Sequence, residues 1–151
     1  MRINIKIKTI KKDFENKVKL PSYSTEGSAG LDLFACIKEN IIIKPGDIKS
    51  IPTGVAIHIA DSSIGGFVFP RSGLSTKHGI SLINSVGVID SDYTGEIICP
   101  IVNHGKVEYV LKPGDRIAQI IFMPVYIADF ILTDELEDTK RGSGGFGSTG
   151  R

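Results

Sequence analysis

The sequence is dominated by short apolar runs, each of strand length and each bounded by turn residues. Isoleucine, valine and phenylalanine are frequent in them, and these side chains favour a pleated, partly buried backbone. No segment has the longer periodicity of an extended amphipathic helix. The pattern predicts an all-β sandwich or barrel, with a jelly roll among the options and at most one short helix, near Arg71 to His78. The runs are Ile3 to Ile7, Ile41 to Ile43, Val55 to Ile59, Phe67 to Phe69, Ile97 to Val102 and Ile117 to Phe122.

Two turns share the sequence Lys-Pro-Gly-Asp, at Lys44 to Asp47 and at Lys112 to Asp115. Proline fixes φ at the second position, and glycine tolerates the positive φ that a type II turn needs at the third. We expect each turn to join two strands. The flanking segments are not similar, so shared turn chemistry explains the recurrence better than an internal repeat.

Length, charge and cysteine usage exclude several classes of protein. A chain of 151 residues, 41% of them hydrophobic, is long enough for one compact core. A formal net charge of +1 argues against nucleic-acid binding and gives no electrostatic case for a membrane surface. Cys36 and Cys99 lack CxxC spacing, so we expect buried free thiols rather than disulfides or a zinc site. The three histidines are dispersed, which argues against a protein-built transition-metal site.

The first ten residues alternate apolar and charged side chains and lack the continuous apolar run of a signal peptide. Nothing in the chain is apolar enough over sufficient length to span a membrane. We therefore expect a cytoplasmic protein.

Beyond Phe130 the composition becomes polar and acidic, from Thr133 to Lys140, and then rich in glycine. We divide the chain into a β core at 1–132 and an acidic connector with a Gly-rich C-terminal lid at 133–151. If extended, the 13 steps from Ala128 to Arg141 span roughly 40 Å. The end of the chain can therefore reach a neighbouring subunit.

The Gly-rich end contains a literal G-x-G-x-x-G from Gly142 to Gly147. A dinucleotide-binding loop must open a helix, and only four residues remain; a Walker A loop needs a lysine that is missing. Two interpretations stay open. Arg141, Phe146, Ser148 and Thr149 can cover a nucleotide, with the glycines permitting close backbone approach to phosphates, or the segment is simply a disordered Gly-rich end.

A second segment, from Phe69 to Ser75, places Arg71, Ser72 and Gly73 in succession. A guanidinium, a hydroxyl and a sterically bare N–H suit a phosphate cradle, although such a motif alone is more often a turn. The chain has 13 lysines but five arginines, and Arg71, Arg116 and Arg141 all fall in candidate site segments.

A third segment runs from Asn84 to Glu96 and is typical of a hairpin. Asp90 follows two apolar residues, so partial desolvation would suit it as a general base. The alternatives are that Asp90 caps a turn and that Tyr93 is a core aromatic. In the apolar segment Ala29 to Ala35, Asp32 needs a partner if buried, either an arginine or a hydrated metal ion.

Read in order, these segments resemble the five motifs of the homotrimeric dUTP pyrophosphatase (dUTPase) family, from about Pro21 to Arg151. The five motifs are Ala29-Gly-Leu-Asp-Leu33, Pro70-Arg-Ser-Gly-Leu74, Gly87-Val-Ile-Asp-Ser-Asp-Tyr-Thr-Gly95, Gly114-Asp-Arg-Ile-Ala-Gln119 and Arg141-Gly-Ser-Gly-Gly-Phe-Gly-Ser-Thr-Gly150.

The resemblance implies a jelly-roll protomer, a homotrimer with shared active sites, and Mg²⁺-dependent hydrolysis of dUTP to dUMP and pyrophosphate. Such an enzyme limits uracil in DNA and supplies dUMP for dTMP synthesis. Asp90 would activate the water that attacks the α-phosphorus, and Asp32 would contact the metal only through water. The resemblance assigns substrate binding to Arg71, Ser72, Gly73, Asn84, Gly87, Val88, Ile89, Tyr93, Gln119, Arg141, Phe146, Gly147, Ser148 and Thr149.

The chain departs from common family forms at Leu31, Ser75 and Thr94, none of which is assigned a catalytic role. One rival is a dCTP deaminase or bifunctional relative on the same scaffold, which the complete C-terminal motif disfavours. The other is a nucleotide-binding regulatory protein without turnover, which should have lost Asp90 or the C-terminal motif.

Overall fold

The structure is a computed structural model that describes residues 2–10 and 18–145. Its elements are short strands and one helix, as the sequence predicts. In chain order they are β1 (Lys6–Thr9), β2 (Ser22–Tyr23), β3 (Leu31–Phe34), β4 (Ile41–Ile43), β5 (Ile48–His58), β6 (Ile64–Pro70), α1 (Ser72–His78), β7 (Ile80–Leu82), β8 (Gly87–Ile89), β9 (Glu96–Asn103), β10 (Tyr109–Leu111) and β11 (Arg116–Pro124).

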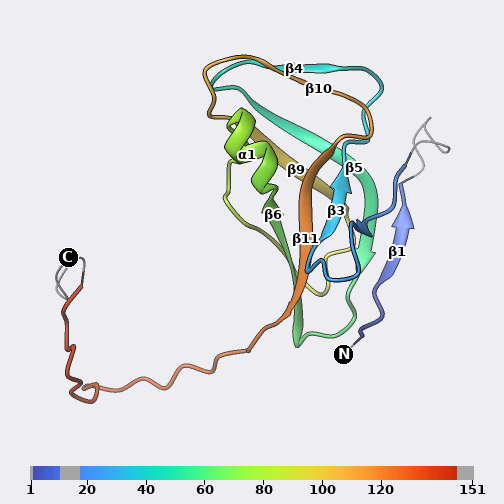
Figure 1. Cartoon of the computed structure of the whole chain (residues 1–151). Coiled ribbons are helices and arrows are strands. Elements are labelled where there is room, and N and C mark those ends of the chain that lie inside the picture. Colours follow the sequence, from blue (N-terminus) through green and yellow to red (C-terminus); the bar gives the residue numbers. More distant parts are fainter. Residues whose placement is uncertain (1, 11–17, 146–151) are drawn as a thin grey trace.

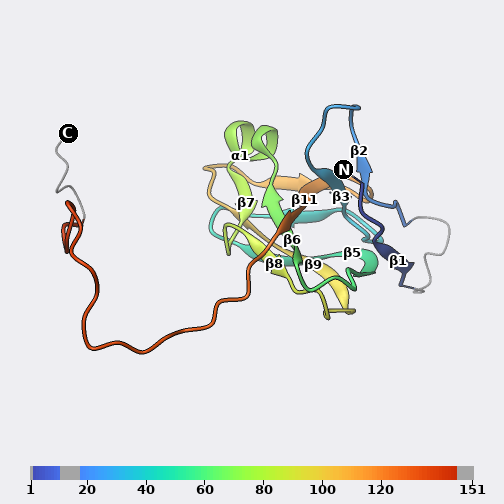
Figure 2. The same ribbon diagram turned by 90° about the horizontal axis from the view of Figure 1, so that it is seen from below.

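The strands form three antiparallel sheets within the described chain. A four-stranded sheet has the order β1-β5-β9-β7, and a five-stranded sheet has the order β2-β3-β11-β6-β8. β4 and β10 form a separate pair at one end of the body (Figure 1). Figure 2 shows the same body from below, with β3 and β11 in the upper part of the view and β5 and β9 beneath them.

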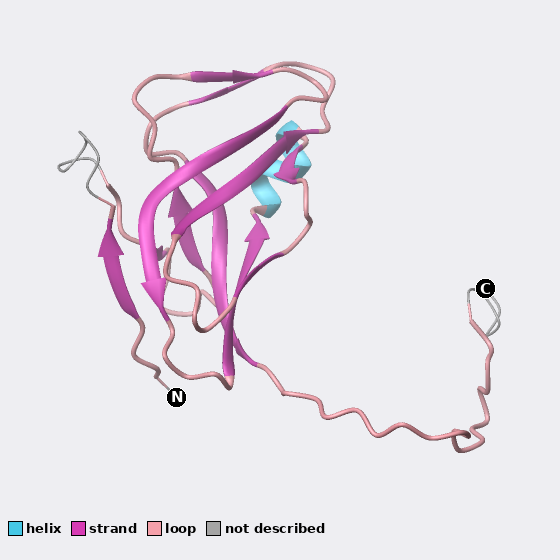
Figure 3. Ribbon diagram, turned by 180° about the vertical axis from the view of Figure 1, so that it is seen from behind, coloured by secondary structure: helices cyan, strands magenta, loops and turns pink. Residues whose placement is uncertain are grey.

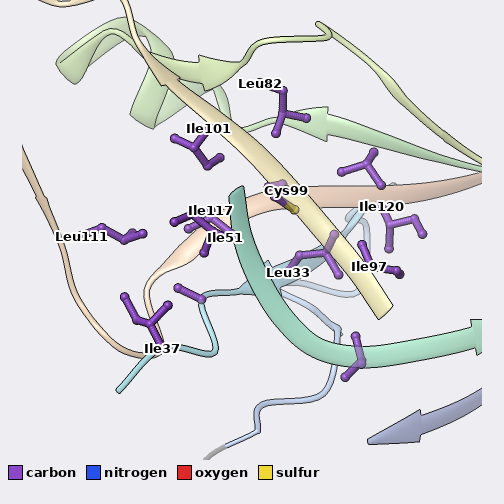
Figure 4. Close-up of a cluster of buried hydrophobic side chains, with 14 of the residues drawn as sticks. Leu33, Ile37, Ile51, Leu82, Ile97, Cys99, Ile101, Leu111, Ile117 and Ile120 are labelled. Carbon is purple, nitrogen blue, oxygen red and sulfur yellow. The ribbon is translucent and has the colours of Figure 1, made fainter. Parts of the chain in front are cut away.

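The hydrophobic core lies between the two larger sheets. Leu33 and Ile120 enter it from the five-stranded sheet, and Ile51, Ile97 and Ile101 from the four-stranded sheet (Figure 4). These five side chains are at most 2% exposed. Strands therefore form where the sequence placed apolar runs, because each run has a face that only the opposite sheet can cover.

Both Lys-Pro-Gly-Asp turns join strands, β4 to β5 and β10 to β11, as predicted. Gly46 and Gly114 have φ values of 82° and 76°, which a side chain would disfavour. In each turn the aspartate carboxylate accepts a hydrogen bond from the backbone N–H of the turn's lysine. The recurrence therefore reflects turn chemistry.

The predicted short helix is α1, and it ends in a tight backbone contact. Gly79 adopts the left-handed conformation with φ 68° and donates its N–H to the carbonyls of Leu74 and Ser75. A Cβ on Gly79 would lie 2.4 Å from the backbone nitrogen of Gly105, in the loop before β10. The end of α1 is thereby fixed against the body.

The two cysteines differ in burial. Both are free, but Cys99 is buried and Cys36 only partly so. Burial raises the pKa of the Cys99 thiol to about 12, so this thiol stays protonated and inert. The expectation of two buried thiols was therefore wrong for Cys36.

The chain leaves the body after β11. Val125 still donates its N–H to the Ser63 carbonyl at 2.8 Å, and from Tyr126 to Gly145 the chain runs away from both sheets (Figures 1 and 3). Tyr126, Phe130 and Leu132 are at least 97% exposed along this segment. The sheets thus end at Pro124, and the boundary placed at residue 132 stays a prediction. Among the described residues, no helix has the length and apolar character needed to cross a bilayer.

Candidate active site

A pocket of about 240 Å³ opens at the meeting point of the loop before β3, the start of α1 and the side chain of Gln119 on β11. Its walls are largely polar, and they include one carboxylate and one guanidinium. The lining residues are Ser24, Ser28, Ala29, Gly30, Asp32, Arg71, Ser72, Gly73 and Gln119.

Strand register brings these segments together. β11 lies between β3 and β6, where Gln119 pairs with Asp32 on one side and with Phe69 on the other. Phe69 therefore lies in the row of Asp32, and because β6 ends at Pro70, Arg71 follows the end of the strand two positions beyond that row. Residues far apart in the sequence therefore meet because three antiparallel strands are held in one register.

Asp32 is the most heavily bonded polar residue of the pocket and is only 7% exposed. Its Oδ1 accepts a hydrogen bond from Arg71 Nε at 2.9 Å, and its Oδ2 accepts from the Ser24 hydroxyl at 2.7 Å and from an Arg116 terminal nitrogen at 3.2 Å. The partner expected of a buried Asp32 is thus a pair of arginines.

The environment of Asp32 favours its charged form. Burial alone would raise the pKa of this carboxyl group, but the hydroxyl of Ser24 and the charges and hydrogen bonds of Arg71 and Arg116 together outweigh it. The pKa of Asp32 is therefore held below its ordinary value of 3.8. Asp32 is ionised at neutral pH and is suited to orient the two guanidinium groups.

Gln119 supports the backbone that carries Arg71. Its Nε2 donates to the carbonyl oxygen of Pro70 at 3.1 Å. A Cβ on Gly30 would lie 2.8 Å from Gln119 Oε1, so a bare backbone at Gly30 makes room for the amide. One amide hydrogen of Gln119 is used in this bond, and the second remains to serve a ligand in the pocket.

Ser72 and Gly73 form the exposed rim of the pocket, in the first turn of α1. A Cβ added to Gly73 would meet nothing within 4 Å. The space beside Gly73 is therefore open to a ligand that approaches the backbone closely. Arg71, Ser72 and Gly73, which the sequence proposed as a phosphate cradle, thus line the same pocket, and their role in binding phosphate stays a prediction.

The hairpin residues proposed from the sequence lie elsewhere. β8 pairs with β6 through Gly66, Phe67 and Val68, at the outer edge of the five-stranded sheet. Of the predicted site residues, Asn84, Gly87, Val88, Ile89, Asp90 and Tyr93 are all absent from the pocket lining. Asp90 is exposed within this chain, so the prediction that its carboxylate is partly desolvated was wrong for the single protomer.

Tyr93 is not a core aromatic, because it is 43% exposed. Its hydroxyl donates to the backbone carbonyl of Glu96 at 2.9 Å. The ring lies close over Gly95, where an added Cβ would approach the Tyr93 ring carbon Cζ to 2.7 Å. The phenol is therefore folded back onto its own turn in a defined orientation.

The C-terminal residues lie apart from the pocket. Arg141 is exposed and donates from Nε to the carbonyl of Gly144 at 2.8 Å, in a local turn. Figure 1 shows this segment away from the body. Phe146, Gly147, Ser148 and Thr149 lie outside the described residues.

Sequence reasoning missed part of the pocket wall. Ser24, Ser28 and Gly30 line the pocket but were not assigned to it. Ser24 lies in a serine-rich loop whose composition indicates only a turn. Arg116 was noted among the five arginines, and the scarcity of arginine was the signal that pointed to it.

The fit of a metal ion can be judged from the oxygen donors. The described residues contain no group of three or more His, Cys, Asp or Glu side chains able to hold a metal. Asp32 is the one carboxylate among the lining residues, and its oxygens already accept three hydrogen bonds. Mg²⁺ commonly binds substrate phosphates and keeps several waters. The lining residues therefore leave most positions around such a metal ion to be filled by phosphate oxygens and water.

Comparisons with known proteins agree on one family. A sequence model described as dUTPase matches residues 16–150. A deoxyuridine 5'-triphosphate nucleotidohydrolase of Desulfitobacterium hafniense is 52% identical over 148 residues, which cover 98% of this chain and 97% of that protein. One from Escherichia coli O7:K1 is 53% identical over 132 residues, 87% of each chain.

Solved structures show the same fold at lower identity. A mutant dUTPase of Staphylococcus bacteriophage 80alpha, solved with dUpNHpp, is 24% identical with a TM-score of 0.81, covering 98% of this chain and 99% of that one. A mutant dUTPase of the S. aureus phage phi11, described with a structural Mg(II) ion, is 20% identical with a TM-score of 0.77, covering 89% and 99%. The fold is thus the jelly roll of these proteins.

Proposed function

The chain belongs to the dUTPase family, and on that premise we propose that it hydrolyses dUTP to dUMP and pyrophosphate. Its close relatives carry the name deoxyuridine 5'-triphosphate nucleotidohydrolase, which makes it an enzyme of the hydrolase class. The observation that carries the proposal is the pocket in which Arg71, Ser72, Gly73 and Gln119 meet.

These four residues hold the phosphate chain. Arg71 contributes a planar guanidinium whose Nε is already fixed by Asp32, so its remaining N–H groups are aimed before the substrate binds. Ser72 and Gly73 contribute a hydroxyl and close backbone N–H groups, and Gln119 contributes its second amide hydrogen. Donors fixed in advance stabilise charge that develops on the phosphates without reorganising during the reaction.

Asp90 is the general base of the proposed reaction. It orients a water molecule in line with the α-phosphorus and accepts its proton as the bond to the pyrophosphate leaving group breaks. The pocket needs such a base from outside, because its own carboxylate, Asp32, is engaged by Ser24, Arg71 and Arg116. Asp90 is exposed on a hairpin away from the pocket of its own chain, which supports delivery to the pocket of a second copy.

The proposed assembly is a homotrimer in which each site combines segments of different subunits. The hairpin would contribute the residues that recognise uracil, namely Asn84, Gly87, Val88 and Ile89. They would form a slot for the uracil ring that is too narrow for a 5-methyl group. Tyr93 would pack under the deoxyribose where a 2′-hydroxyl would clash.

The C-terminal motif would close the site from another subunit. Phe146 would stack on the uracil, and Arg141, Gly147, Ser148 and Thr149 would approach the terminal phosphates. Closure excludes water other than the nucleophile, which strengthens every charge interaction inside. The largely exposed course of residues 126–145 supports this reach.

Mg²⁺ is the proposed cofactor, and it would offset the charge of the phosphate oxygens when bound with the substrate. Asp32 would contact its waters at most, since three protein donors already occupy the carboxylate. We take the protein to act in the cytoplasm. There the reaction would limit uracil in DNA and supply dUMP for dTMP synthesis.

The proposal is tested by pyrophosphate release from dUTP, dTTP, dCTP and UTP in parallel, with Mg²⁺ present. We expect a strong preference for dUTP in kcat/KM. Equal rates with all four nucleotides would refute the assignment, and release of ammonia from dCTP would instead identify the deaminase rival.

A further inference from the structure

Glu96 is the first residue of β9. It makes hydrogen bonds to two separate segments, the turn that carries Tyr93 and strand β5. Its carbonyl oxygen accepts the hydrogen bond of the Tyr93 hydroxyl at 2.9 Å. Its side-chain Oε1 accepts the backbone N–H of Gly54 at 2.9 Å, from β5. The orientation of Tyr93 is thus tied to the neighbouring strand.

Gly54 is where the β5–β9 ladder is interrupted. Pro52 pairs with Ile98 and Ala56 with Glu96, so three residues of β5 lie opposite one residue of β9. Gly54 has φ 73°, and a Cβ there would lie 2.7 Å from the Cys36 sulfur. The Glu96 carboxylate supplies the acceptor that the Gly54 N–H lacks in the ladder, and so holds the first residue of β9 in place.

The ring of Tyr93 lies at the surface of the protomer. It is 43% exposed and lies over Gly95, which has no side chain to hold it. Among the described residues, the bond to the Glu96 carbonyl is the hydrogen bond that the Tyr93 hydroxyl makes, so it contributes directly to the orientation of the ring.

We propose that Glu96 is a positioning residue for sugar discrimination: its carboxylate anchors the start of β9 on Gly54, and its carbonyl thereby fixes the Tyr93 ring against which a deoxyribose packs. This inference rests on the proposed function, in which Tyr93 excludes a 2′-hydroxyl. Loss of the anchor lets the ring move aside, so a ribonucleotide is admitted more easily.

The experiment compares kcat/KM for dUTP and UTP in the wild-type protein and in Glu96→Ala, Glu96→Gln and Tyr93→Phe. One neutral hydrogen bond corresponds to a factor of about two to ten, so we expect Glu96→Ala and Tyr93→Phe each to lower the dUTP/UTP ratio by about that factor. Glu96→Gln keeps an acceptor oxygen and should retain most of the ratio. In the double variant Glu96→Ala/Tyr93→Phe, the dUTP/UTP ratio should fall no further than in the single variant with the lower ratio, because both changes break the same linkage.

Thr53→Val is the matched control. Thr53 donates its hydroxyl to the Ile97 carbonyl at 2.7 Å, in the same irregular stretch of β5 but without a link to Tyr93. It should lower Tm and leave the ratio unchanged. The inference is overturned if Thr53→Val changes the ratio as much as Glu96→Ala, or if Tyr93→Phe leaves it unchanged.

A second readout needs no turnover. Ring motion of isotope-labelled Tyr93, measured by NMR without nucleotide, should increase in Glu96→Ala and not in Thr53→Val. If the wild-type protein fails to hydrolyse dUTP, the proposed function falls while this measurement still decides whether Glu96 positions the ring. Unchanged ring motion in Glu96→Ala would refute the positioning role by itself.

Discussion

Arg71 and Asp32, which are 39 residues apart in the sequence, are joined Nε to Oδ1 at 2.9 Å in the wall of the pocket. The side chain of Asp32 is 10% exposed and that of Arg71 is 26% exposed. This pair is screened from water more than a surface ion pair, and Ser24 and Arg116 complete its hydrogen bonding. The geometry of the cradle therefore depends on the charge of one carboxylate.

The first prediction concerns the pKa of Asp32. Because this pKa is lowered from 3.8 in the folded state, the carboxylate contributes stability above that pH, and the contribution is lost as the pH falls through the folded pKa. Ser24→Ala removes one of the groups that lower the pKa and should raise it, as measured by an NMR titration of the carboxyl carbon.

The same reasoning gives a stability profile. The difference in Tm between the wild-type protein and Asp32→Asn should be largest near neutral pH and shrink on acidification below 3.8. For the titration with Ser24→Ala, the control is Ser50→Ala, at an exposed serine on β5. A difference in Tm that stays constant down to strongly acidic pH would contradict a stabilising role for the Asp32 charge.

The second prediction concerns Gly73. An alanine Cβ there meets nothing within 4 Å, and alanine favours a helix over glycine by about 1 kcal/mol, so Gly73→Ala should keep or slightly raise Tm. The added methyl group enters space beside the pocket, so KM for dUTP should rise about tenfold, the factor that 1.4 kcal/mol of lost binding gives. Gly27→Ala, where the Cβ also meets nothing, should change neither quantity. An unchanged KM in Gly73→Ala would remove this position from the substrate contact.

The third prediction concerns Asn103, which is fully buried. Its amide nitrogen donates to the carbonyls of Ile43 and Val107, and its Oδ1 accepts the N–H of Gly105. Asn103→Asp places a carboxylate oxygen against two carbonyls, so we expect a loss of about 3 kcal/mol or more in the free energy of unfolding. Urea denaturation measures it, with the exposed Asn40→Asp as control. A loss below about 1 kcal/mol would show that the loop rearranges around the new carboxylate.

The fourth prediction concerns Asp90. Asp90→Asn keeps the size of the side chain but cannot accept the proton of water, so binding of dUTP should persist while kcat falls by a factor of about 10² to 10⁴. Calorimetry with a non-hydrolysable analogue measures binding, and pyrophosphate release measures turnover. Asp92→Asn, two residues along the same hairpin, is the control. Near-normal kcat in Asp90→Asn would exclude Asp90 as the base.

The fifth prediction concerns the C-terminal motif. The strands end at Pro124 and the described part of the following segment lies away from the sheets, so a chain stopped after Lys140 should retain its fold and Tm. It should lose most of kcat, because the site remains open to water. Circular dichroism checks the fold, and pyrophosphate release checks the rate. Full activity of the shortened protein would exclude a role in closure.

The fold was largely predictable because local chemistry and long-range packing agree. The run Ile41 to Ile43 is a strand with the same bounds, and the two Lys-Pro-Gly-Asp turns join the strands they were expected to join. The N-terminal run was less well placed: the alternation begins at Ile3, but β1 begins at Lys6, where pairing with β5 begins. Alternation predicts a strand but not the length of its partner.

The site was predictable by residue type but not by position. Arg71 and Gln119 were expected together, and strand register does bring them together. Asp90 was expected to be partly desolvated, yet it is exposed, because burial depends on what covers a hairpin at the edge of a sheet. Ser24 could not be found from the sequence, since its bond to Asp32 exists only after β2 pairs with β3.

The register of β3, β11 and β6 also links ligand binding to folding. Asp32, Arg71 and Gln119 come within reach of one another only when all three strands are paired, so an unfolded chain has no partial version of the pocket. A nucleotide that occupies the pocket therefore draws the whole chain toward its native state by mass action, raising stability by about 2.7 kcal/mol at a hundredfold excess over Kd. Nucleotide supply would then set how long this protein survives proteolysis as well as how fast it works.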